Sequence, residues 1–155
     1  MNNTKWYKKL EDLIKYVDKY NLPPTFYNGN KHEVKLARWV ELQQEDYLSK
    51  TNYMSNYDIY EKWTNFISNP KYSLFFNIFD NWEKTLIVAK YYIENINCIE
   101  TNLKANISVD NLINWISEQH QNYIDKSSLM KYDKFHNKWD KFIKDEKYKY
   151  YINSL

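Results

Sequence analysis

Glycine, proline and cysteine are all scarce in this sequence, and each scarcity excludes a class of protein. One glycine and three prolines in 155 residues leave almost no material for the tight turns of a β-sandwich or a β-barrel. A glycine-rich phosphate loop is likewise excluded, and with it an ATPase of the P-loop type. The single cysteine, Cys98, cannot form a disulfide within the chain. At this length the chain is also too short for a helicase motor or a polymerase.

Long apolar runs are missing as well. The least charged stretch, from Ser73 to Phe79, is much shorter than the roughly 20 residues of a membrane-spanning helix. The first residues lead into a charged amphipathic segment and not into the apolar centre of a signal peptide. Together with the lone cysteine, these features predict an intracellular protein, cytoplasmic or nuclear, with no membrane partner.

Aromatic residues, by contrast, are abundant, with 6 Trp, 16 Tyr and 7 Phe. The mean hydropathy of −0.84 is low because Lys, Asn and Tyr are frequent, so it does not indicate a disordered chain. The net charge of +2 permits binding to nucleic acid but does not demand it.

The tryptophans reveal an internal repeat of 76 residues. A shift of this size superposes every Trp on another without a gap: Trp6 on Trp82, Trp39 on Trp115 and Trp63 on Trp139. The same shift matches other positions, among them Leu10 with Leu86, Gln43 with Gln119 and Phe66 with Phe142. Chance does not plausibly pair six Trp in this way. We therefore interpret the chain as a duplicated unit that runs from Thr4 to Phe79 and again from Asp80 to Leu155.

Apolar residues within each unit recur with the period of three amphipathic helices. In the first unit the three faces are Trp6, Leu10, Leu13, Ile14, Val17 and Tyr20; Leu36, Trp39, Val40, Gln43 and Tyr47; and Ile59, Trp63, Phe66 and Ile67. No useful stretch alternates with period two, so we expect no sheet. The predicted fold is all-α, with two tandem three-helix units that each have an aromatic core.

Several residues predict where these helices begin and end. Ser55 and Ser108 are candidate N-caps, and Asp80 with Glu83 has the pattern of a capping box at the start of the second unit. Pro70 is expected to end the third helix of the first unit, because proline cannot continue a helix.

One unit reads as Trp, Leu four places later, a proline-containing loop, Leu-x-x-Trp-Val/Ile-x-x-Gln, Tyr, Met and finally Trp-x-x-Phe. This pattern resembles the helicase-associated domain, a three-helix module repeated in tandem in bacterial helicase-like proteins and in proteins of large DNA viruses. The matching residues of the first copy are Trp6, Leu10, Pro24, Leu36, Trp39, Val40, Gln43, Tyr47, Met54, Trp63 and Phe66.

The resemblance implies an accessory module that binds nucleic acid beside a motor, and the Lys- and Asn-rich composition is closer to the viral version. Two departures limit the comparison. Where the family has Arg after the motif Gln, this chain has Gln44 and His120, so no phosphate contact is carried over to those positions. The second copy also lacks the proline of the first loop.

The main candidate for a binding surface is a row of lysines in the third helix of the second unit. Lys131, Lys134, Lys138 and Lys141 fall at i, i+3, i+7 and i+10, beside the predicted apolar face. From Lys126 to Lys149 there are eight Lys and four acidic residues, a local charge of +4. A helix lying in a groove would use these lysines to neutralise phosphates without reading sequence. The alternative is a solvated face with acidic neighbours.

Other residues that could stack on bases or hold a metal give weaker signals. The helical spacing of the tryptophans favours a core role over base stacking, and the better stacking candidates are Tyr57, Tyr60 and Tyr132. Cys98, His120 and His136 lack the short paired spacings of a zinc site. We predict no catalytic residue, no metal site and no cofactor, and therefore no enzyme.

Three functional interpretations remain open at this point. The first is a non-enzymatic nucleic-acid-binding accessory module that contacts mainly the phosphate backbone. The second is a protein-protein interaction or scaffold module, for which the near-neutral charge and abundant Tyr are equally suitable. The third is an inactive fragment of a longer repeat array.

Overall fold

A computed structural model describes residues 3–27, 30–95 and 109–154, and the secondary structure of this part of the chain consists of helices with no strand. The all-α prediction is therefore confirmed. The chain divides into two compact units, Met1–Ile78 (unit 1) and Phe79–Leu155 (unit 2). This division falls one residue before the predicted boundary between Phe79 and Asp80. That the units arose by duplication stays a prediction.

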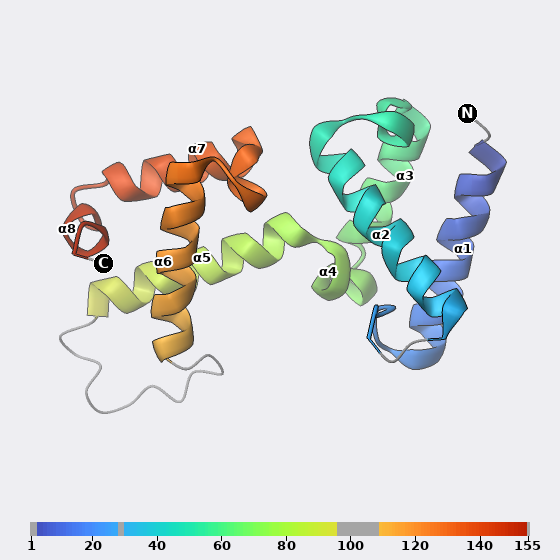
Figure 1. Cartoon of the computed structure of the whole chain (residues 1–155), viewed down its shortest axis with the longest axis horizontal. Coiled ribbons are helices and arrows are strands. Elements are labelled where there is room, and N and C mark those ends of the chain that lie inside the picture. Colours follow the sequence, from blue (N-terminus) through green and yellow to red (C-terminus); the bar gives the residue numbers. More distant parts are fainter. Residues whose placement is uncertain (1–2, 28–29, 96–108, 155) are drawn as a thin grey trace. The chain divides into compact units, whose positions relative to one another are not determined.

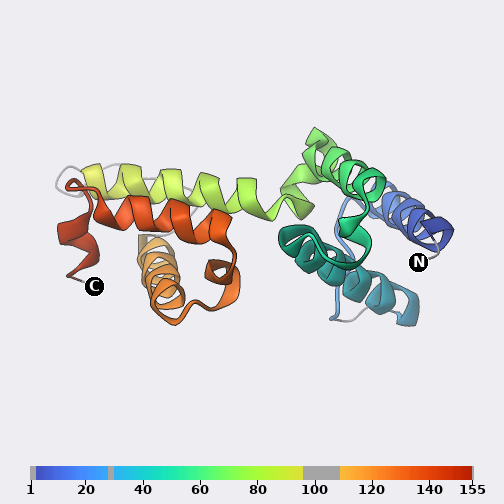
Figure 2. The same cartoon turned by 90° about the horizontal axis from the view of Figure 1, so that it is seen from above.

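Unit 1 contains four α-helices and one turn of 3₁₀-helix (Figures 1 and 2). In chain order these are α1 (Asn3–Tyr20), α2 (Lys31–Ser49), η1 (Asn52–Ser55), α3 (Tyr57–Ser68) and α4 (Pro70–Phe76). The described part of unit 2 has the same order, with α5 (Ile78–Asn95), α6 (Val109–Asp125), η3 (Ser128–Lys131), α7 (Asp133–Lys144) and α8 (Lys149–Ile152).

The prediction of three helices per unit was wrong by one short helix in each. In unit 1, Pro70 does not only follow the end of α3, because it also occupies the first position of α4, where its fixed φ and missing N–H are favourable. Asn69 caps α4 by accepting a hydrogen bond from the Lys71 N–H at 2.9 Å. Tyr72 and Phe76 of α4 pack against Phe66, with ring centroids 4.9 and 5.2 Å away, so α4 closes the core.

Two of the predicted helix starts were also wrong. Asp80 lies inside the first turn of α5 and does not cap it, because α5 already begins at Ile78. The cap of α3 is Asn56, whose side chain accepts from the Ile59 N–H at 3.2 Å, whereas Ser55 donates to the Asn52 carbonyl. Ser108 lies outside the described residues.

The tryptophans form the core of each unit, as predicted. Trp6, Trp63, Trp82 and Trp139 are buried, and Trp39 and Trp115 are partly buried beside them. Their rings meet in triplets, with centroids 6.0 to 6.4 Å apart in unit 1 and 6.0 to 6.4 Å apart in unit 2. Such aromatic contacts stabilise a small helical unit beyond the burial of area alone.

Candidate nucleic-acid interface

The four lysines predicted to form one stripe lie on two elements. Lys134, Lys138 and Lys141 are on α7, but Lys131 is the last residue of η3. The two elements are separated by Tyr132, whose extended backbone (φ −98°, ψ 127°) interrupts the helix. The prediction of a single stripe on one helix was therefore wrong at Lys131, whose ammonium group lies 5.0 Å from the centre of the Tyr132 ring.

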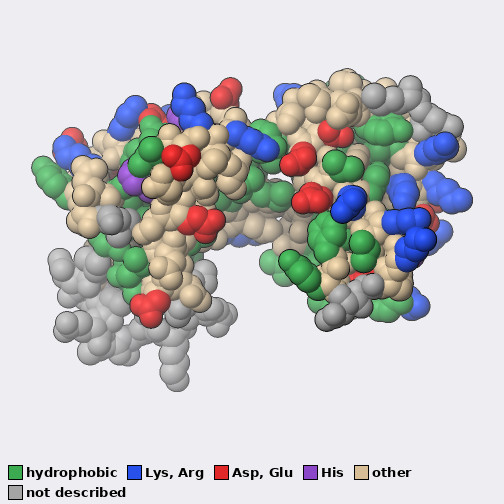
Figure 3. Space-filling model, viewed as in Figure 1, with side chains coloured by type: hydrophobic (Ala, Val, Ile, Leu, Met, Phe, Trp, Pro, Cys, Tyr) green, Lys and Arg blue, Asp and Glu red, His purple; other side chains and the backbone are tan. Residues whose placement is uncertain are grey.

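Two of the α7 lysines, Lys134 and Lys138, contact α5. The ammonium group of Lys134 lies 3.5 Å from the centre of the Phe79 ring, and Lys138 forms an ion pair with Glu83. Lys141 is exposed and follows Lys138 by three residues, so the helical period places it on the same flank. Figure 3 shows Lys side chains gathered over α7.

A fourth lysine on this surface comes from α5. The Lys90 ammonium group lies 5.8 Å from the centre of the Phe142 ring and 5.7 Å from that of Tyr148, so it reaches across to α7 and to the residue before α8. The local sequence around Lys90 gives no signal for this role, because the proximity arises only when α5 packs against α7. We call the surface formed by Lys90, Lys134, Lys138 and Lys141 the α5–α7 edge.

The α5–α7 edge belongs to unit 2 alone. At the positions 76 residues earlier, unit 1 has Ile14, Asp58, Lys62 and Asn65, which together carry no net charge. The units therefore keep similar cores but differ in the charge of this edge.

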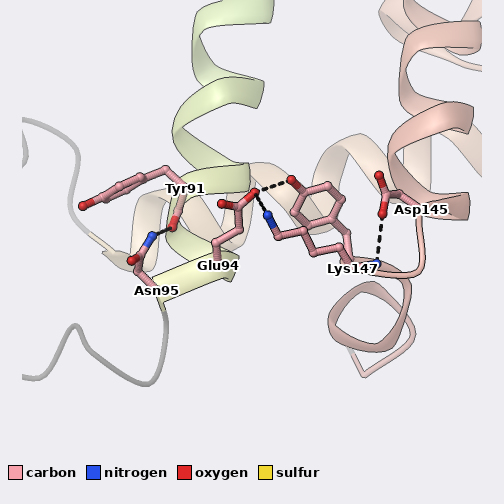
Figure 4. Close-up of polar contacts among 6 residues, drawn as sticks. Tyr91, Glu94, Asn95, Asp145 and Lys147 are labelled. Carbon is pink, nitrogen blue, oxygen red and sulfur yellow. Dashed lines mark hydrogen bonds and ion pairs between the residues drawn. The ribbon is translucent and has the colours of Figure 1, made fainter.

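The C-terminal end of α5 is tied to the segment before α8 (Figure 4). Glu94 accepts a hydrogen bond from the Tyr148 hydroxyl and pairs with the Lys147 ammonium group at 2.8 Å. Lys147 and Tyr148 together lower the pKa of Glu94 below its ordinary value. Burial, followed by the bond to Glu94, raises the pKa of Tyr148 to about 12. Both groups are thereby held in their neutral-pH ionisation states, and the cluster links the end of α5 to the segment before α8.

The other flank of α7 packs on α6 through stacked rings. The His136 ring lies 4.7 Å from that of Tyr123, at an interplanar angle of 27°. The Tyr123 hydroxyl donates to Asp140 at 2.5 Å, and Lys144 pairs with the same carboxylate at 2.8 Å. Lys144 and Tyr123 lower the pKa of Asp140. Lys144 is thus paired with an acidic residue on this flank, whereas Lys134 and Lys138 lie on the α5–α7 edge.

The tyrosines predicted to stack on bases and the residues considered as metal ligands are the remaining candidates from the sequence. Tyr57 is exposed, whereas Tyr60 is half-buried and stacks on Tyr47 with ring centroids 4.7 Å apart. Tyr132 is also half-buried, near Phe135. Of the three residues considered as metal ligands, Cys98 lies outside the described residues. Within the described part of the chain, no group of three or more His, Cys, Asp or Glu side chains is placed to hold a metal ion.

Comparisons with protein-family models, with curated proteins and with solved structures found no match to this chain. Among the described helices, none has the length and apolarity needed to cross a membrane.

Proposed function

We propose that this protein is a non-enzymatic module that binds nucleic acid through the phosphate backbone, as helicase-associated modules are thought to do. The observation that carries the proposal is the α5–α7 edge, where Lys134, Lys138 and Lys141 lie on one flank of α7 and Lys90 joins them from α5. The resemblance of the Trp, Leu and Gln pattern to helicase-associated domains supports the same class of function.

The ion pair between Lys138 and Glu83 does not oppose this proposal. Both side chains are partly exposed, at 43% and 31%, and pairs of this kind contribute no more than about 1 kcal/mol. A phosphate group can replace the carboxylate at little cost. Lysine is a flexible point charge and not a planar donor pair suited to base edges, so we expect contacts that do not depend on sequence.

The test is fluorescence anisotropy with labelled single-stranded and double-stranded DNA. The variant K131Q/K134Q/K138Q/K141Q removes the predicted lysines, and K50Q/K62Q/K84Q/K126Q removes the same charge from exposed lysines elsewhere. We expect the first variant to bind more weakly and with a shallower salt dependence, and the second to bind nearly as the wild type does. Equal loss in both variants would show a non-specific effect of net charge and would contradict the assignment of the edge.

Protein-protein interaction is the second candidate function, and α5 gives it one specific observation. Ile87 and Tyr91 are one helical turn apart and are 60% and 58% exposed. Large apolar and aromatic side chains of this kind are enriched at the centres of protein interfaces. Binding to a protein partner that tolerates salt and is lost in the Tyr91→Ala variant would favour this function over the first.

A further inference from the structure

Unit 1 carries a second cationic surface, on elements other than those that form the α5–α7 edge. Residues 3–38 contain eight cationic and four acidic residues, a local charge of +4, whereas residues 39–78 have a charge of −2. The cations are Lys5, Lys8, Lys9, Lys15 and Lys19 of α1 and Lys31, Lys35 and Arg38 of α2. All but the half-buried Lys9 are exposed. Figure 3 shows Lys and Arg side chains gathered over α1 and α2.

Ion pairs do not neutralise this surface. Within the described residues, ion pairs of unit 1 involve Lys71 and Asp18, and none of the eight cations. Two of the four acids are occupied elsewhere: Asp18 binds Lys71 and the Tyr72 hydroxyl, and Glu33 accepts from the Tyr16 hydroxyl at 2.5 Å and the Thr25 N–H at 3.2 Å. Glu11 and Asp12 are the other acids on α1. The positive charge therefore stays available to an external anion.

Two of these cations, Lys5 and Lys31, lie at the N-terminal ends of their helices. The N-terminal end of a helix carries a partial positive charge, so cations in the first turn are unfavourable by a few tenths of a kcal/mol each or more. Lys5 lies in the first turn of α1, which has no acidic residue there, whereas Lys31, the first residue of α2, shares its first turn with Glu33. In unit 2 the first turn of α5, the counterpart of α1, instead contains Asp80, the favourable sign. A bound polyanion would offset the repulsion in unit 1.

The surface has almost no counterpart in unit 2. At the positions 76 residues later, Lys8 is matched by Lys84, but the other described positions are uncharged: Lys5 is replaced by Asn81, Lys9 by Thr85, Lys15 by Tyr91, Lys19 by Asn95, Lys35 by Asn111 and Arg38 by Asn114. Each unit thus has a cationic surface at positions where the other unit carries little or no net charge. The cores of the two units are alike, so core packing does not explain why the charges of these surfaces differ.

We propose that α1 and the first half of α2 form a second phosphate-binding surface, so that the protein contacts nucleic acid through both units. This inference rests on the proposed function and adds a site to it. Lys5 and Lys19 are separated by about 21 Å along the helix axis, at 1.5 Å per residue, which equals about six phosphate steps along one strand of a duplex. Charge complementarity identifies the partner as a polyanionic backbone.

The experiment compares two double variants of the full chain that each remove two exposed positive charges from unit 1. K15Q/K19Q removes them from the proposed surface, and K50Q/K62Q removes them from other elements. Glutamine retains helix propensity, and circular dichroism checks that both variants keep the wild-type helical signal. Anisotropy with a labelled single strand and a labelled duplex is measured at several salt concentrations.

We expect K15Q/K19Q to weaken binding about tenfold at low salt and to reduce the log-log salt slope by about 1.5, while K50Q/K62Q stays within about twofold of the wild type. If K15Q/K19Q matches its control while K134Q/K141Q weakens binding, the second surface is refuted and the proposed function stands. If the wild type binds neither probe at low salt, the proposed function fails and the second surface fails with it.

Discussion

The indole N–H of Trp6 donates a hydrogen bond to the side-chain oxygen of Gln43 at 2.6 Å, and both residues are buried in the core of unit 1. The corresponding bond in unit 2 joins Trp82 and Gln119 at 2.9 Å. In each unit a buried glutamine thus connects the first and second helices. Because a buried N–H without a partner is costly, the glutamine satisfies a group that water cannot reach.

We predict that Gln43→Leu destabilises unit 1 by about 1 to 3 kcal/mol, because it leaves the Trp6 N–H buried and unpaired. The neighbouring Gln44 is half-buried, and Gln44→Leu serves as the matched control with an expected change within about 0.5 kcal/mol. Urea unfolding measures both. Equal stability of the two variants would contradict a structural role for the bond.

Trp139→Ala is expected to cost about 3 to 5 kcal/mol, because the side chain is fully buried between Trp82, Trp115 and Phe142. Since each unit has its own core, unit 2 should unfold first and unit 1 should retain its helices. Circular dichroism during thermal unfolding would then show two steps. A single transition with complete loss of helix would contradict independent cores.

The cluster of Glu94, Lys147 and Tyr148 predicts a dependence of stability on pH at both extremes. The pKa of Glu94 is lowered in the folded protein, so its stabilising contribution is present above the ordinary carboxyl value and is lost as the pH falls. The pKa of Tyr148 is raised to about 12, so stability declines as the pH rises from 10 towards 12.

Tyr148→Phe and Glu94→Gln test the two effects, and each variant also alters the other group because the two side chains share a hydrogen bond. The unfolding free energy is measured against pH for the wild type and both variants. Glu94→Gln should reduce the slope of the acid side of the profile, to which Asp18 and Asp140 also contribute through their lowered pKa values. Tyr148→Phe should reduce the slope of the alkaline side, to which Tyr16 and Tyr151 also contribute because their pKa values are raised to about 12. An acid profile unchanged by Glu94→Gln would show that the carboxylate contributes nothing in the folded state.

Lys90 should contribute to nucleic-acid binding as strongly as an α7 lysine. We expect Lys90→Gln to weaken binding several-fold, as Lys141→Gln does, because the two lie on one surface. Lys84→Gln is the control, since Lys84 is an exposed lysine of the same helix that is not part of the α5–α7 edge. Equal effects of Lys90→Gln and Lys84→Gln on affinity would contradict the composition of that edge.

Much of the fold followed from the sequence, because large apolar side chains recur at helical spacing and leave few alternatives. Trp63 and Trp139 were predicted to be core residues from their spacing, and both are buried. The short helices α4 and α8 were missed as helices, since four to seven residues hold too few turns to show a period. Asn69 followed by Pro70 was the local signal that could have predicted α4.

The candidate surfaces were less predictable than the core. Spacing along one helix placed Lys134, Lys138 and Lys141 together, but it could not show that Tyr132 separates Lys131 from them. Lys90 joins the edge only through packing between helices. The surface of unit 1 was not predicted, although its signal is present in the sequence. Residues 3–38 carry the same local charge of +4 as residues 126–149.

The most direct test of the account is the salt dependence of wild-type binding to labelled DNA, measured by anisotropy from about 50 to about 300 mM salt. Neutralisation of phosphates by lysines predicts micromolar affinity at low salt and a log-log slope near −3 or steeper. Absence of binding at low salt, or an affinity that does not change across the range, would contradict a phosphate-binding role and would favour the protein-interaction function.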